Sequence, residues 1–163
     1  MNAIFVNSFL NLLNEFLNDL KILLPIWDDI LATQKTIELA EWSMSAKNAI
    51  IEGFMYYVSP FYEKILLREE SFFLDTKNIE NNDRFKEVDE DTQSENYVKM
   101  FQLKGVWEQF NTHNKNTIWD YFHALIVNGA KASTNPKYKQ ILVWIEENKN
   151  EIEEARKKSL MGQ

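Results

Sequence analysis

The chain has 163 residues, of which 45% are hydrophobic and 13% aromatic, and its formal net charge is −7. This length fits one domain with a single core, and the absence of cysteine excludes disulfides, thiolate metal sites and cysteine nucleophiles. The negative charge argues against broad electrostatic capture of nucleic acid or anionic membranes, and the small numbers of glycine (4) and proline (3) argue against a turn-rich β-sandwich or barrel.

Apolar residues recur every three or four positions from Phe5 to Leu24, a period that predicts an amphipathic helix ending before Pro25. Polar residues interrupt this segment, so we expect no membrane span, and it lacks the basic start and cleavage site of a secretion signal. A second helix is predicted over 26–41. Its expected core positions are Ile26, Ile30, Ile37 and Leu39.

A serine within 42–45 can cap a third helix, which is predicted over 45–58. The pair Ser59-Pro60 is typical of a helix start, with serine as the cap and proline in the first turn, so a short fourth helix follows. A further turn over 71–74 is expected to bury Phe72 and Phe73.

The window 68–95 holds ten acidic and four basic residues, and within it the stretch 75–92 has few apolar side chains. Such a stretch gains too little from burial to offset its ordering entropy, so we predict a long acidic surface loop. Asp89, Glu90 and Asp91 could attract a divalent cation, but the stretch has no glycine and does not match the ligand spacing of an EF-hand. We therefore interpret it as a solvated charge run.

Thr92 and Glu95 form a capping box that predicts a helix over 93–111, and the asparagine-rich run 111–116 predicts a turn. A sixth helix follows and reaches Gly129, or Ala132 if 130–132 extends it. Asn135-Pro136 begins the last helix, which continues past Ile152. The sequence thus predicts an all-α, single-domain bundle of about six to seven helices over 1–163. Its core covers roughly 3–145, and a charged helical extension over 146–163 projects beyond that core.

Residues with catalytic chemistry do not form a familiar pattern. His113 lies in a polar run and His123 lies among aromatic residues, and neither has a Ser/His/Asp setting or metal-ligand spacing. A phosphate-binding glycine-rich loop is also missing from the sequence. We therefore predict no enzyme activity, no catalytic residue, no cofactor and no metal.

The aromatic excess has two interpretations. Helical spacing favours core packing, whereas rings left exposed would serve as protein contacts. A nucleic-acid stacking platform is less favoured, because few basic residues accompany the rings. The candidate interaction residues are Trp107, Trp119, Tyr121, Phe122, Phe72 and Phe73.

Two stretches resemble a family. The first is SPFYEKI at 59–65 followed by EESFFL at 69–74, and the second is NKNTIWDYF at 114–122. In this order they resemble small helical proteins of nucleocytoplasmic large DNA viruses over roughly residues 1–130. The resemblance implies a virion or host-cytoplasm setting, with no secretion, and it implies no reaction.

From these observations we expect a non-enzymatic protein–protein interaction or structural module with other proteins as partners in an assembly, such as a minor capsid protein. The first alternative is a nucleic-acid-associated regulator that uses a basic C-terminal patch from Lys131 to Lys139 together with Arg156, Lys157 and Lys158. The second is an enzyme with an unfamiliar carboxylate site, which would require a deep pocket that holds at least two carboxylates.

Overall fold

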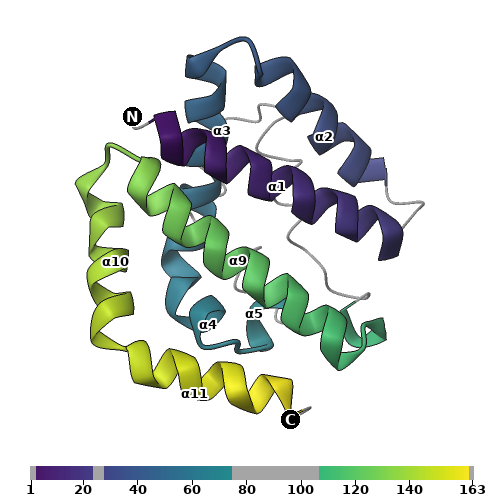
Figure 1. Ribbon diagram of the computed structural model, residues 1–163, viewed down its shortest axis with the longest axis vertical. Helices are drawn as coiled ribbons and strands as arrows, with labels where there is room; N and C mark the ends of the chain where they lie inside the picture. The colour runs from purple at the N-terminus through teal and green to yellow at the C-terminus, as the bar shows by residue number, and fades with distance from the viewer. Residues whose placement is uncertain (1–2, 24–27, 75–106, 162–163) are drawn as a thin grey trace.

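A computed structural model describes residues 3–23, 28–74 and 107–161 of the chain (Figure 1). No strand occurs in these ranges, and six of the helices are twelve residues or longer, which confirms the predicted all-α class. The elements are α1 (Ala3–Leu23), α2 (Asp28–Ala40), α3 (Met44–Val58), the 3₁₀ turn η1 (Ser59–Phe61), α4 (Tyr62–Leu66), α5 (Ser71–Leu74), the 3₁₀ turn η2 (Trp107–Gln109), α9 (Thr112–Ala132), α10 (Pro136–Glu147) and α11 (Lys149–Leu160).

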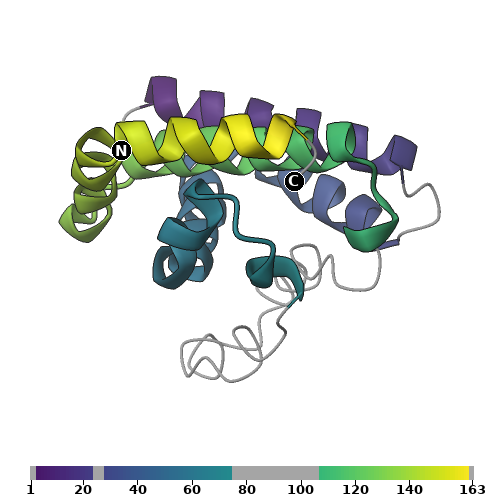
Figure 2. The same ribbon diagram turned by 90° about the horizontal axis from the view of Figure 1, so that it is seen from below.

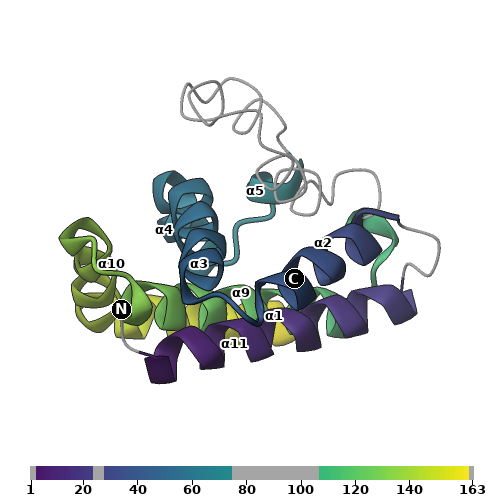
Figure 3. The ribbon, with the colours of Figure 1, turned by 90° about the horizontal axis from the view of Figure 1, so that it is seen from above.

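The helices form two layers. The two longest, α1 and α9, run side by side in opposite directions, and α11 lies in the same layer on the other side of α9 (Figures 1 and 2). Helices α2, α3, α4 and α5 lie on one face of this layer, and α10 crosses its end (Figure 3). Among these helices, none is long and apolar enough to cross a membrane.

Aromatic rings fill the space between the layers. Phe9 of α1 meets Phe54 of α3 edge-on with 5.2 Å between ring centroids, and within the first layer Phe16 of α1 meets Phe122 of α9 at 5.7 Å. Both spacings lie in the range favoured by aromatic pairs. The backbone of α9 also comes close to α3, since a Cβ added to Gly129 would lie 2.5 Å from the Sδ of Met55.

Two of the predicted helix starts are confirmed by their caps. The Ser43 hydroxyl accepts a hydrogen bond from the Ala46 N–H at the start of α3. The Asn135 side chain accepts one from the Lys137 N–H, and Pro136 occupies the first turn of α10. Each cap satisfies an N–H that has no partner within the helix.

Two predicted local features are wrong. The asparagine-rich run 111–116 begins α9 instead of forming a turn, because Asn111 caps this helix by accepting from the Asn114 N–H. Ser59 does not cap a helix start: its hydroxyl donates back to the Tyr56 carbonyl, and 59–61 is a 3₁₀ turn. The end of the helix predicted over 93–111 also differs, since 107–109 forms η2 and the earlier residues lie outside the described part.

The last helix differs from the prediction as well. It stops at Glu147, resumes at Lys149, and α11 turns back to lie along α9 (Figure 1). The extension predicted over 146–163 is therefore helical through Leu160 but does not project away from the bundle. The acidic loop predicted over 75–92 lies outside the described residues.

Candidate functional site

Four of the six aromatic residues expected to make protein contacts are buried in the core: Phe72, Trp107, Trp119 and Phe122. Trp107 packs edge-on against Trp119 at 5.2 Å, and Phe72 packs against Phe122 at 6.0 Å. Their expected role as exposed contact residues is therefore wrong. Of the two interpretations of the aromatic excess, core packing is the one that these four rings support.

The other two candidates differ. Tyr121 is half-buried, its ring lies 5.2 Å from that of Phe16, and its hydroxyl donates to the Asp19 carboxylate at 2.5 Å. Burial raises the pKa of Tyr121, and the hydrogen bond to Asp19 adds to the effect. Its polar group is thus engaged within the chain. The side chain of Phe73 lies outside the described residues.

Three of the ten large apolar side chains that are exposed in the described residues lie where α2 is followed by α3. We call Leu39, Trp42 and Met44 the apolar corner; their exposed fractions are 73%, 91% and 46%. The sequence predicted Leu39 as a core residue, and this is wrong. Trp42 was passed over because it lies between two helices, where no periodicity indicates which way a side chain points.

A groove runs beside the apolar corner between α1 and α2, with a volume of about 600 Å³. Leu10 and Ile37 are its buried apolar residues. One side carries amides of α1, and the other carries Glu38 of α2 and Glu41 of the turn that follows it. The amides are those of Asn7, Asn11 and Asn14. Their spacing of three and four residues places them on one face of α1.

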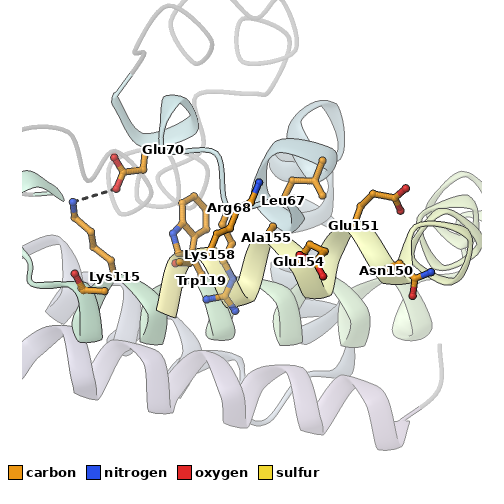
Figure 4. A pocket seen from close by; sticks show the side chains of 12 residues that line it. Leu67, Arg68, Glu70, Lys115, Trp119, Asn150, Glu151, Glu154, Ala155 and Lys158 are labelled. Atoms are coloured by element: carbon orange, nitrogen blue, oxygen red, sulfur yellow. Dashed lines mark hydrogen bonds and ion pairs between the residues drawn. The ribbon is translucent and has the colours of Figure 1, made fainter. Parts of the chain in front are cut away.

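A second cleft, of about 650 Å³, lies between α11, the first turns of α9 and the turn that joins α4 to α5 (Figure 4). Its charged side chains are of both signs. They are Arg68, Glu70, Lys115, Glu151, Glu154 and Lys158. Lys115 and Glu70 form an ion pair at 3.2 Å across one end of this cleft. The balance of charge does not select an anion or a cation.

Arg68 links three segments at this cleft. Its side chain is only 7% exposed, and its guanidinium donates to the Asn116 side-chain oxygen at 2.9 Å and to the Asp120 carboxylate at 2.5 Å. Asn116, also buried, donates to the Ser159 carbonyl at 3.1 Å and accepts from the Ser159 hydroxyl. Arg68 has a positive φ of 56°, which is strained for any residue but glycine, so tertiary contacts hold this turn.

The two histidines have different surroundings. His113 is exposed at the start of α9. His123 is half-buried, and burial lowers its pKa below the ordinary value of 6.5; the nearby Arg68 adds to this effect and Asp120 opposes it. His123 is therefore neutral at pH 7. Among the described residues no group of three or more His, Asp or Glu side chains is placed to hold a metal ion, and Asp89–Asp91 lie outside them.

Comparison with protein-family models, curated proteins and solved structures found no match to this chain. Its function is therefore inferred from its own surfaces.

The basic residues expected to bind nucleic acid fall into two separate groups. Lys131–Lys139 lies where α9 meets α10, and 156–158 lies near the far end of α11 (Figure 1). Within the first group, the Lys139 ammonium donates to the Ala130 and Lys131 carbonyls at 2.7 and 2.9 Å, where it caps the end of α9. These placements weaken the case for a single phosphate-binding patch.

Proposed function

We propose that the chain is a non-enzymatic protein-binding module that contacts its partner through the apolar corner of Leu39, Trp42 and Met44. The observation that carries this proposal is the exposure of Trp42, at 91%, beside two other exposed apolar side chains within six residues of chain. Single exposed apolar residues are common on protein surfaces. A group of exposed apolar residues that includes tryptophan is less common on such surfaces. Tryptophan is also enriched among the residues that dominate binding energy.

The groove beside the corner indicates the chemistry of the partner. Glu38 and Glu41 both precede Trp42 in sequence and line the groove, and among the described residues neither side chain forms an ion pair. Lys47 is the basic residue of the same lining. A partner with an apolar pocket for the indole and basic residues beside it would complement this surface.

The polar clusters of the chain favour binding over catalysis. Arg68 and Asp120 neutralise each other, and His123 keeps its imidazole neutral beside them. None of these groups forms the nucleophile and base pair that covalent catalysis requires. The cleft that Arg68 lines has charges of both signs, which suits contact with a polypeptide better than concentration of a small ion.

A place in the virion or in the infected-cell cytoplasm, for example as a minor capsid protein, rests on the resemblance of residues 59–74 and 114–122 alone. We retain it as part of the proposal, since a protein-binding module fits an assembly.

The proposal is tested by affinity capture from extracts of the source, using the wild type, Trp42→Glu and Val143→Glu. Val143 is a matched control, because it is another exposed apolar residue and lies on α10, away from the corner. We expect a protein that the wild type and Val143→Glu both retain and that Trp42→Glu loses. Equal capture by all three variants would show that the corner is not the contact surface.

A further inference from the structure

One residue separates α10 from α11. Asn148 is neither glycine nor proline, and the sequence around it predicts a helix that continues without interruption. At the bend, the Asn148 backbone N–H and its side-chain amide both donate to the Trp144 carbonyl at 2.9 Å. No side chain caps the start of α11. The bend is therefore not required by local sequence and depends on where α11 docks.

The docking of α11 rests on few contacts. None of its residues is buried. Its firmest attachment is the double hydrogen bond of Ser159 with Asn116, near its last turn. Helix α11 also forms one wall of the cleft beside Arg68, and Glu151, Glu154 and Lys158 belong to this wall (Figure 4).

We propose that α11 is an exchangeable arm, which in a second state continues α10 as one helix and docks against α9 of a second copy of the chain. In a two-fold dimer each copy would give one arm and receive one, so every contact of α11 with α9 is kept. The gain arises at the hinge. A continuous helix over 136–160 pairs the N–H groups of the first turn of α11 with the last carbonyls of α10, which lack helical partners at a break.

This surface is separate from the apolar corner, so the exchange is independent of the proposed function. The partner is a second copy of the chain, because its α9 presents the same surface, with Asn116, that α11 covers in the bent state. Without an arm the cleft would lose the side that Asn150, Glu151, Glu154, Ala155, Lys158 and Ser159 supply.

The hinge is tested with Asn148→Ala and Asn148→Gly in the full chain. Both variants lose the side-chain bond to Trp144. Alanine favours the helical state of residue 148 over glycine by roughly fivefold in the equilibrium constant of each hinge. Because two hinges straighten in each dimer, the dimer dissociation constant of Asn148→Ala should be about thirtyfold lower than that of Asn148→Gly. Light scattering over a range of concentrations measures both. Equal dissociation constants, or monomers of both variants at every concentration, would overturn the proposal.

A disulfide distinguishes an arm-exchanged dimer from a dimer that forms through another surface. The variant for this test combines Asn148→Ala with Asn116→Cys and Ser159→Cys. The chain has no other cysteine, and these side chains touch in the bent state. After oxidation, non-reducing electrophoresis of the dimer fraction should show covalent dimers, and the monomer fraction should show internally linked chains. If every disulfide in the dimer fraction lies within one chain, the dimer forms through another surface, and this result contradicts the exchange.

Discussion

Replacing Arg68 with methionine tests whether the polar cluster beside the cleft stabilises the fold. Methionine keeps the apolar stem but removes the bonds to Asn116 and Asp120. Hydrogen bonds to charged groups contribute about 1.5–3 kcal/mol each. The freed Asp120 is 62% exposed and regains water, and Asn116 keeps its bonds to Ser159, so we expect a loss below the summed range of about 3–6 kcal/mol. The free energy of unfolding should fall by about 2–3 kcal/mol, measured by urea denaturation.

For a chain of this length, such a loss lowers the melting temperature by about 5–10 °C. The matched control is Asp120→Asn, which keeps an oxygen for Arg68 at an exposed position. It should cost less than about 1 kcal/mol, as exposed ion pairs do. If Asp120→Asn costs as much as Arg68→Met, or if Arg68→Met costs nothing measurable, the burial of the Arg68 side chain does not determine how much this cluster stabilises the fold.

Three further predictions concern pH, the core and a cap. Because the pKa of His123 is lowered in the folded state, the unfolded chain binds a proton first as pH falls. Stability should therefore be complete above about pH 6.5 and decline below it, and His123→Gln should remove part of this decline in denaturation series between pH 7 and 5. Phe122→Ala should destabilise the fold by about 3–5 kcal/mol, whereas Trp42→Ala should change it by less than about 0.5 kcal/mol, because the first ring is buried and the second is exposed. A thermal melt that ranks these two variants the other way would contradict the assigned core. Ser43→Ala should cost about 1 kcal/mol in urea denaturation through loss of the α3 cap, and Ser45→Ala, inside the helix, should not.

The helices that apolar periodicity marks most clearly are those that the sequence predicted. In α1 the buried residues recur at the expected spacing, from Val6 through Phe9, Leu13 and Phe16 to Leu20. The helix starts at Ser43 and Asn135 were also predictable, because a cap needs only a few neighbouring residues. Local signals of this kind do not depend on the rest of the fold.

The start of α9 shows why other features were missed. An asparagine-rich run favours a turn, since asparagine side chains compete with helical hydrogen bonds. Here Asn116 is buried and bonded to Arg68 and Ser159, which lie 48 and 43 residues away in sequence. Contacts over such separations override local propensity, and no short window contains them. The end of α10 was missed as well, because the short window around Asn148 predicts a continuous helix and does not contain Asn116, to which Ser159 of α11 is bonded.

The candidate site was missed for a different reason. Periodicity identifies which residues share a helix face but not whether another helix covers that face. Trp119 and Phe122 lie on faces that other helices cover. Leu39 was wrong for another reason, because it is nine residues after Ile30 and therefore lies on the opposite, exposed face of α2. The single signal available for the apolar corner was a tryptophan between two predicted helices.

The most direct test of a binding role for the apolar corner is site-specific photo-crosslinking from position 42 in the native cellular setting, with position 143 as the reference. The account predicts covalent adducts with a partner protein from position 42 and none from position 143. Equal adducts from the two positions, or none from position 42, would contradict it.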